Sequence, residues 1–409
     1  MNTSTLFPLK CGVQHYQWGA KEHNGRKPYI AELLNLQSNS KPFAELWLGA
    51  HPKLPASVVS ENRKETPLSE VIAVAPRDIL GSGLVDQNIK TLPFLLKVLD
   101  CESPLSIQAH PDKSMAEKLH KKDPEHYPDD NHKPEIAVGI KGMKAFCQFR
   151  PAENIKQDLK RLNTLAEYFA DFLAAESDAK PNAEWLQNIY SCLFQLPQTQ
   201  VEHLIDQLVK ELGQLEDIKN NDRWFLSLLE QYPGDRGTLN AYFLNIINLK
   251  PEEAVFLAAG EPHAYLQGTI IECMANSDNV VRAGLTSKFV DTQALVNMLT
   301  YRDAEPQTMQ GETAQDTGNK VYKVPAPEFQ LEIYKHDRNY SDTFPSDGLV
   351  SLMIVLEGSA TLTDDHNTFE APRGSAWLWP AAVKSCSITC RDDNTKIVRA
   401  RPNLDFFGE

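Results

Sequence analysis

The feature that most constrains the fold of this chain is a block of helical periodicity between two stretches with the pattern of short strands. From residue 7 to about residue 150, short apolar runs are broken by glycine, proline and asparagine, as expected of strands and loops. From residue 151 to 242 apolar residues recur at helical spacing, and strand patterns return at residues 254–257 and 269–274. This order predicts a helical domain inserted into a β domain.

The helical block is clearest at residues 201–215 (VEHLIDQLVKELGQL). Four apolar residues there lie at helical spacing: Leu204, Ile205, Leu208 and Leu212. Pro181 and Pro197 divide the block into several helices. In the preceding stretch, residues 94–99 (FLLKVL) predict a buried strand.

The C-terminal part predicts a second β region. Residues 305–320 are polar and almost free of large apolar side chains, so we expect a surface loop or linker. Short strand patterns follow it at residues 329–334, 349–356, 360–363, 376–379 and 396–400. Such spacing predicts a small antiparallel sandwich or barrel. We therefore expect three domains: a discontinuous β domain (1–150 and 243–320), an inserted helical domain (151–242) and a C-terminal β domain (321–409).

Composition excludes some classes of protein. The chain has 409 residues and a formal net charge of −14, which argues against binding to nucleic acid. No run of roughly 18 apolar residues predicts a membrane span, and the N-terminal residues lack the pattern of a signal peptide, so we expect a cytoplasmic protein. The seven cysteines are scattered, which makes a disulfide framework unexpected.

Candidate metal ligands occur in three short stretches. In an extended segment, Ser106, Gln108 and His110 share one face, and Leu105, Ile107 and Ala109 share the other, which we expect to face the core. That geometry could present two ligands to one ion. Judged alone, this stretch is better explained by a surface strand with its polar side chains in water.

The other two stretches are His132-Lys133-Pro134-Glu135 and Gly260-Glu261-Pro262-His263. Pro134 favours an extended Lys133, so that Lys133 and Glu135 would point to the same side. Each stretch also has a simple alternative, a solvated charged turn and a structural histidine. Taken together, Gln108, His110, Glu135 and His263 suit a borderline metal such as zinc.

Residues 269–274 alternate, so that Glu272 shares a face with Ile270 and Met274. A glutamate within an apolar strand must be paired, protonated or functional, because burying an unpaired carboxylate is costly. Arg282 and Lys288 follow in a glycine-containing segment.

These stretches resemble a known family. SIQAHPDK (106–113), HKPE (132–135) and GTIIECMANSDNVVRAGLTSK (268–288) are similar to motifs of the type I phosphomannose isomerases, which belong to the cupin superfamily. YQWG (16–19) and AELWLGAHP (44–52) match as well. The resemblance covers nearly the whole chain in order, and the block at 268–288 makes it specific.

The resemblance implies a mainly β fold: a cupin (jelly-roll) catalytic barrel in the discontinuous domain, an inserted helical domain and a C-terminal cupin-like β domain. It implies one Zn²⁺ per chain, held by residues matching Gln108, His110, Glu135 and His263. The implied reaction interconverts mannose 6-phosphate and fructose 6-phosphate through a cis-enediol or enediolate. The partners would be these two sugar phosphates, and we expect a monomer.

The resemblance also suggests roles for cavity residues. Arg282 is expected to stabilise the enediolate, and Glu272 is the first candidate for the proton-transfer base. Lys133 is the rival base. Three residues are expected near the substrate phosphate: Ser106, Lys97 and Lys288. Lys113 could add to that positive charge, and Trp18 and Glu45 would line the cavity, although Trp18 could equally serve packing.

Two alternatives remain at this point. His110, Glu135 and His263 alone would satisfy the two-histidine, one-carboxylate iron site of an oxygenase, and many cupins have that chemistry. A non-catalytic, sugar-phosphate-binding cupin would keep the fold and lose turnover. Gln108 as a fourth ligand argues against the first alternative, and the joint presence of Glu272, Lys133 and Arg282 argues against the second.

Overall fold

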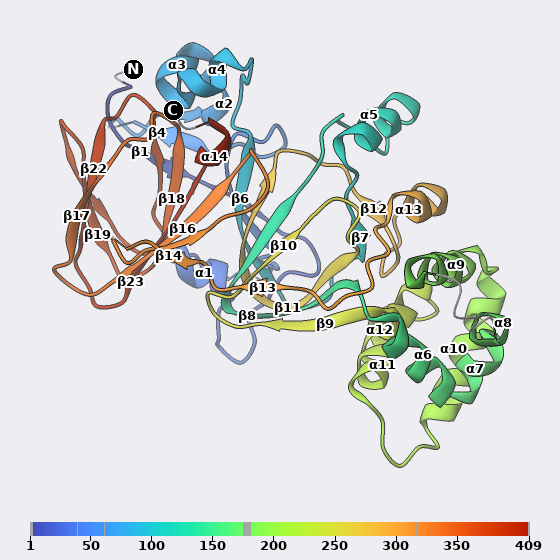
Figure 1. The fold of residues 1–409 in the computed structure, drawn as a ribbon. Coiled ribbons are helices and arrows are strands. Elements are labelled where there is room, and N and C mark those ends of the chain that lie inside the picture. The colour runs from blue at the N-terminus through green and yellow to red at the C-terminus, as the bar shows by residue number, and fades with distance from the viewer. Residues whose placement is uncertain (1–2, 39, 61, 175–180, 316, 408–409) are drawn as a thin grey trace.

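The computed structural model describes residues 3–38, 40–60, 62–174, 181–315 and 317–407. Figure 1 shows strands of the C-terminal part on one flank, a large central sheet, and a group of helices on the opposite flank. The fold is mainly β, with antiparallel sheets and a helical insertion, as the sequence predicted. Within the described residues, no helix is both long and apolar enough to cross a bilayer.

The central sheet contains ten strands in antiparallel pairing. They are β2 (Gly12–Gln14), β3 (Glu45–Leu48), β6 (Phe94–Cys101), β7 (Gln108–Ala109), β8 (Glu135–Phe149), β9 (Leu244–Leu249), β10 (Ala254–Leu257), β11 (His263–Ala275), β12 (Val281–Arg282) and β13 (Thr308–Met309). The long strand β11 pairs with β8 on one edge and with β6 on the other. This pairing places Glu272 beside Lys97 of β6.

The ribbon formed by β8 and β11 curls strongly. Glu135, at the start of β8, pairs with Met274 near the end of β11, yet its carboxylate lies 3.3 Å from the imidazole of His263 at the start of β11. An extended strand of this length spans about 35 Å, so the two ends of β11 approach each other only because the ribbon bends. Two register shifts, at Tyr265/Gln267 and Thr269/Ile270, supply bends of the kind that β-bulges introduce. The curl is that of a cupin-like sheet, although the strand pairing among the described residues forms open ladders.

A nine-stranded sheet packs on one face of the central sheet. Its strands are β1 (Phe7–Lys10), β4 (Ser57–Val59), β5 (Glu65–Pro67), β14 (Glu312–Thr313), β15 (Lys320–Tyr322), β16 (Gln330–His336), β18 (Ser351–Glu357), β21 (Ala376–Trp379) and β23 (Thr395–Arg401). A four-stranded sheet completes the C-terminal region with β17 (Ser341–Pro345), β19 (Ala360–Thr363), β20 (Thr368–Ala371) and β22 (Ser385–Cys390).

The N-terminal segment contributes to the C-terminal sheet. Strand β1 pairs with β21, and β4 and β5 extend the sheet beyond it. Strand patterns along the sequence indicate where strands occur but not which distant strand completes a sheet. The three-domain division proposed from the sequence stays a prediction. Such a division must also allow for the N-terminal strands β1, β4 and β5, which belong to the C-terminal sheet.

The polar segment 305–320 is more ordered than the sequence suggested. The prediction of a loop is wrong at two places, because β13 pairs with β10 of the central sheet and β14 pairs with β15 of the nine-stranded sheet. Edge strands pair on one side only, so they tolerate polar side chains. The segment therefore connects the two sheets as edge strands of both.

Alternation along β11 separates a core face from a cavity face. Ile271 and Cys273 belong to the hydrophobic core between the two large sheets, together with Ile354 and Val398 of the nine-stranded sheet. Ile270 lies in a separate cluster on the other face. The predicted sharing of a face by Ile270 and Glu272 is thereby consistent with the packing.

The helical region follows β8 and leads into β9. Its helices are α6 (Ala152–Arg161), α7 (Asn163–Tyr168), α8 (Ala170–Ala174), α9 (Asn182–Gln195), α10 (Gln198–Leu212), α11 (Asn220–Gln231), the 3₁₀ helix η1 (Arg236–Leu239) and α12 (Asn240–Phe243). Pro181 and Pro197 directly precede α9 and α10, and the four apolar residues predicted for α10 are buried. The other helices are α1 (Tyr29–Leu33), α2 (Leu68–Val74), α3 (Pro76–Leu80), α4 (Ser82–Asp86), α5 (Lys113–Lys122), α13 (Thr292–Met298) and α14 (Leu404–Phe407).

One partly buried carboxylate joins the two large sheets. Glu252, in the turn before β10, forms ion pairs with Lys320 at 2.7 Å, Lys396 at 3.2 Å and Lys335 at 3.6 Å, all on the nine-stranded sheet. Burial raises the pKa of Glu252, but the lysines outweigh it and lower the pKa to about 2. The ionised form of Glu252 is therefore favoured in the folded protein.

We expect Glu252→Gln to lower stability at pH 7, because it removes the charge that the three lysines face. Since the folded pKa of about 2 lies below the ordinary value of 4.5, this contribution is present above about pH 4.5 and is lost as the pH falls toward 2. The stability difference between wild type and variant should therefore shrink over that range in urea unfolding followed by circular dichroism. Glu65→Gln, which breaks an exposed pair with Lys10, is the control and should change stability by no more than about 1 kcal/mol. A pH-independent difference for Glu252→Gln would contradict the assignment.

Candidate metal centre and cavity

A cavity of about 370 Å³ opens on the face of β3, β6 and β11 opposite the nine-stranded sheet. Nine of the twelve residues predicted from the sequence line it: Trp18, Glu45, Lys97, Ser106, Gln108, Lys133, Glu272, Arg282 and Lys288. The other three, His110, Glu135 and His263, are buried beside Gln108 and Lys133. The structure thus brings all twelve into one region.

His110, Glu135 and His263 form a compact buried cluster. Their candidate ligand atoms lie within 4.8 Å of one another, and the two imidazole Nε2 atoms lie 3.4 Å and 3.3 Å from the Glu135 carboxylate. The Nδ1 atom of His110 lies 2.8 Å from the carbonyl oxygen of Asn279, and that of His263 lies 2.9 Å from the carbonyl oxygen of Glu261. An N–H on Nδ1 that donates to a carbonyl leaves Nε2 with a free lone pair, as a metal ligand requires.

The cluster has the protonation state and the unmet bonding capacity of a metal site. Burial, and next to it the charge of Lys133, lowers the pKa of His110 to about 4. Burial acts to raise the pKa of Glu135, but Lys133 and His110 outweigh it and hold that pKa well below its usual range. Lys133 Nζ forms an ion pair with Glu135 Oε1 at 2.8 Å. Among the described residues, however, no side chain or backbone group has hydrogen-bond geometry toward either carboxylate oxygen or toward His110 Nε2. The neutral imidazole of His110, the imidazole of His263 and the ionised carboxylate of Glu135 fit a divalent cation.

Gln108 lies at the edge of this cluster. Strand β7 pairs with the start of β11, so Gln108 stands opposite His263, and its amide nitrogen lies 3.5 Å from His263 Nε2. Turning the amide by half a rotation exchanges its nitrogen and oxygen and would point Oε1 at the cluster. Gln108 can therefore supply a fourth, neutral oxygen ligand.

A lysine between two glutamates forms the second charged group of the cavity. Lys97 Nζ lies 3.1 Å from Glu272 and 3.5 Å from Glu45, and all three side chains are buried. The ammonium also lies over the ring of Trp47, whose N–H donates to Glu45. Burial acts to lower the pKa of Lys97, but Glu272 and Glu45 outweigh it and raise that pKa. For Glu272, burial dominates and raises the pKa in spite of Lys97.

Arg282 and Lys288 supply positive charge that is not matched by a carboxylate. Strand β12 pairs with β7, so Arg282 stands opposite Gln108, and its guanidinium has no ion-pair partner in the described ranges. Burial lowers the pKa of Arg282 from its ordinary value. Lys288 is exposed at the end of a segment whose Thr286 and Ser287 also line the cavity. These two charges are therefore available to an anion in the cavity.

Lys113 does not belong to this group. Its ammonium lies 3.4 Å from the Asp130 carboxylate on the surface, and Lys113 is not among the cavity residues. It begins α5, which starts after Asp112 and carries Lys113 away from the strand. The prediction that Lys113 adds to the positive cavity is therefore wrong.

Several cavity residues were not found from the sequence: Tyr16, Trp47, Lys53, Tyr232, Tyr265 and Asp278. Tyr265 could have been found, because it lies two positions after His263 on the same strand. Its buried hydroxyl has no hydrogen-bond partner among the described residues. Asp278 pairs with Lys53 at 2.9 Å, and Tyr232 follows the end of α11. Neither residue lies in an alternating strand pattern, so the sequence did not mark them as cavity residues.

Fold and site together define a cupin-like protein with a prepared site for a metal ion next to a charged cavity. Residues 6–152 match the family model described as "Phosphomannose isomerase type I, catalytic domain". The mannose-6-phosphate isomerase of Macaca fascicularis is 40% identical over 351 residues, covering 81% of this chain and 82% of that protein. The enzyme of the same name from Mus musculus is 38% identical over 410 residues, with 94% and 95% covered.

Solved structures agree with these sequence matches. A variant of the phosphomannose isomerase from Salmonella typhimurium is similar with a TM-score of 0.86 and 27% identity, covering 98% of this chain and 100% of that one. A zinc-bound mannose 6-phosphate isomerase is similar with a TM-score of 0.84 and 26% identity over the same shares. The chain belongs to the mannose-6-phosphate isomerase family, and within it to type I. This membership gives no support to the oxygenase or the non-catalytic alternative.

Proposed function

We propose that this protein interconverts mannose 6-phosphate and fructose 6-phosphate with one bound Zn²⁺. The observation that carries the proposal is the buried His110–Glu135–His263 cluster beside the cavity that holds Glu272 and Arg282. The relatives bear the name of this enzyme, and a similar solved structure is described as zinc-bound. Gln108 is the proposed fourth ligand.

The bound metal would act as a Lewis acid toward the oxygens of the sugar carbons that exchange a proton. The chain's own residues would do the rest. Isomerisation needs a base that takes the proton from C2 of the open-chain aldose and returns it to C1, while the hydroxyl proton passes from O2 to O1. The species between the two sugars is a cis-enediol or enediolate.

Glu272 is the proposed base. Its carboxylate lies in the cavity wall, and burial raises its pKa above the ordinary value, which makes it a stronger base than an exposed glutamate. Lys97, at 3.1 Å, holds the carboxylate in place. Lys133 is the rival, but its ammonium is already committed to Glu135 at 2.8 Å. In this proposal Lys133 orients the ligand carboxylate.

Arg282 is the proposed stabiliser of the enediolate. A half-buried guanidinium without a carboxylate partner in the described structure is a fixed positive charge, and such a charge stabilises an oxyanion more strongly in a closed cavity than in water. Ser106 and Lys288 are proposed for the phosphate group. Backbone hydrogen bonds join Ile107 to Ala283 and Gly284, so Ser106 and the segment leading to Lys288 run side by side.

The assignments of Lys97 to the phosphate, of Trp18 and Glu45 to substrate contacts, and of a monomeric state stay predictions. Lys97 is engaged by two carboxylates, so Lys288 is the stronger phosphate candidate. A cytoplasmic location is also proposed, and the seven unpaired cysteines are compatible with a reducing compartment.

Removal of the metal tests the proposal directly. Treatment with a chelator should abolish formation of fructose 6-phosphate from mannose 6-phosphate, and added Zn²⁺ should restore it. His110→Ala should bind less zinc than the wild type by elemental analysis, whereas His203→Ala, on the exposed face of α10, should bind the same amount. Full activity of metal-free protein would refute the metal assignment.

Arg282→Ala should lower kcat by about 10²–10³, because the lost charge acts mainly on the enediolate. The KM for mannose 6-phosphate should change much less. Steady-state kinetics on the zinc-loaded protein measures both constants. Arg223→Ala, which removes an exposed arginine of α11, is the matched control and should leave kcat unchanged. A rise in KM with kcat intact would make Arg282 a substrate-holding residue instead.

Exchange of the C2 proton distinguishes the two candidate bases. Glu272→Gln keeps the shape of the side chain and removes its basicity, so exchange of the C2 proton with solvent should stop. Lys133→Met should slow turnover yet leave measurable exchange. Nuclear magnetic resonance of the substrate in D₂O follows both reactions. Exchange that survives in Glu272→Gln and disappears in Lys133→Met would transfer the role to Lys133.

A further inference from the structure

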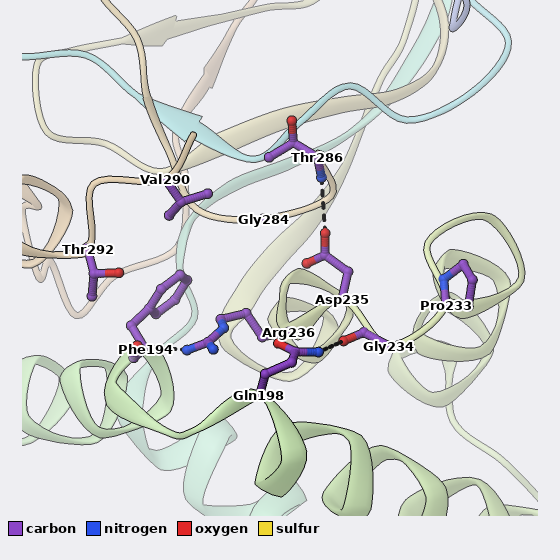
Figure 2. A pocket seen from close by; sticks show the side chains of 10 residues that line it. All are labelled: Phe194, Gln198, Pro233, Gly234, Asp235, Arg236, Gly284, Thr286, Val290 and Thr292. Atoms are coloured by element: carbon purple, nitrogen blue, oxygen red, sulfur yellow. Dashed lines mark hydrogen bonds between the residues drawn. The ribbon is translucent and has the colours of Figure 1, made fainter. Parts of the chain in front are cut away.

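The segment Gly284–Lys288, which ends at the proposed phosphate lysine, lies between two cavities. On one side it lines the site cavity. On the other side Gly284 and Thr286 line a second cavity of about 380 Å³, formed with α9, α10 and the turn before η1. Figure 2 shows this second cavity, with Thr286 above it and Asp235 reaching up from the turn. Thr286 lines both cavities, so the segment forms part of the wall between them.

The backbone of this segment is strained at Leu285. Its φ of 53° lies in the left-handed region, which a branched side chain rarely adopts. Leu285 is nevertheless buried, and its side chain packs in the hydrophobic cluster of the helical region. Such a conformation persists only where the surrounding structure holds it.

Asp235 contributes to that hold from the side of the helical insertion. Its Oδ2 accepts a hydrogen bond from the backbone N–H of Thr286 at 3.0 Å, directly after the strained residue (Figure 2). Its Oδ1 accepts from the N–H of Gly237 at 2.7 Å and so caps η1. One carboxylate therefore joins the end of the helical insertion to the segment that carries Lys288.

The two backbones are also in direct contact at this point. A Cβ added to Gly284 would lie 2.5 Å from Gly237 Cα, so both positions need glycine for the close approach. Tyr232, just before the turn that carries Asp235, makes a second contact near the proposed phosphate region. Its hydroxyl donates to the carbonyl oxygen of Pro104 at 2.7 Å. Pro104 lies two residues before Ser106.

We propose that Asp235 is a positioning residue that holds the Thr286–Lys288 segment, and with it the phosphate end of the site, against the helical insertion. This inference rests on the proposed function for the identity of the anion. Asp235 does not line the site cavity and acts only through the N–H of Thr286. The carboxylate of Asp235 and the backbone contact beneath it thus connect the helical insertion to the Thr286–Lys288 segment, beside Tyr232, which lines the site cavity directly.

The test uses Asp235→Ser, because serine can still cap η1 but its short side chain cannot reach Thr286. In the zinc-loaded protein we expect KM for mannose 6-phosphate to rise about tenfold, the loss of one hydrogen bond to a charged group, with kcat changed less than about threefold. Hydrogen exchange measured by mass spectrometry should become faster in a peptide covering residues 285–288. Unchanged KM or unchanged exchange would overturn the proposal.

Glu211→Ala is the matched control for a purely structural effect. Glu211 also accepts from two backbone N–H groups, those of Asn163 at 2.6 Å and Thr164 at 2.9 Å, but within the helical region alone. It should lower the melting temperature without raising KM or the exchange of residues 285–288. An equal rise in KM in both variants would reduce the role of Asp235 to general stability and overturn the proposal.

A double-mutant cycle identifies the path of the effect. If Asp235 acts through the position of Lys288, then Asp235→Ser should add little to the KM of Lys288→Ala. Full additivity would overturn that path. Should the wild-type protein fail to convert mannose 6-phosphate, the proposed function would be wrong, while the exchange measurement would still test the hold on Thr286.

Discussion

The curl of the β8–β11 ribbon is the constraint on which the rest of the site depends. Glu135 and His263 are 11 strand positions apart by pairing, yet their side chains meet at 3.3 Å. The same curl directs Glu272 and Tyr265 into one cavity and leaves Ile271 and Cys273 in the core on the other face. A straight ribbon would keep the alternation of side chains but separate the glutamate from the histidine. The metal centre is therefore a consequence of the two register shifts in β11 as much as of the ligand residues.

The sequence predicted which residues belong to the site better than it predicted the contacts between them. Alternation in extended segments places Gln108 with His110 and Glu272 with Ile270, and a local pattern is enough for that. No local pattern could show that Lys97 stands between Glu272 and Glu45, because three strands distant in the sequence must pair in register to produce that contact. The resemblance assigns Lys97 to the phosphate, and nothing in the sequence indicates the two carboxylates that engage it.

The same limit applies to the fold. The helical block and most of the strands follow from periodicity, and Pro181 and Pro197 mark helix starts. Strand β1 completes the C-terminal sheet, and the polar segment 305–320 pairs with both large sheets. Both pairings depend on partner strands far away in the sequence, which a single stretch of sequence does not reveal. Asp235, beside the site, is the clearest case, because its proposed role depends on a hydrogen bond to a residue 51 positions away.

The distribution of partners explains how a chain with a net charge of −14 can receive an anion. Glu135 is paired with Lys133 and Asp278 with Lys53, whereas Glu45 and Glu272 share the single positive charge of Lys97. Charge pairs this close cancel at the distance of a bound sugar, because the fields of the two partners oppose each other. Arg282 and Lys288 have no such partner among the described residues, so their positive potential is not cancelled by a nearby carboxylate. The local potential therefore depends on which charges are unmatched, and the segment held by Asp235 carries one of the two.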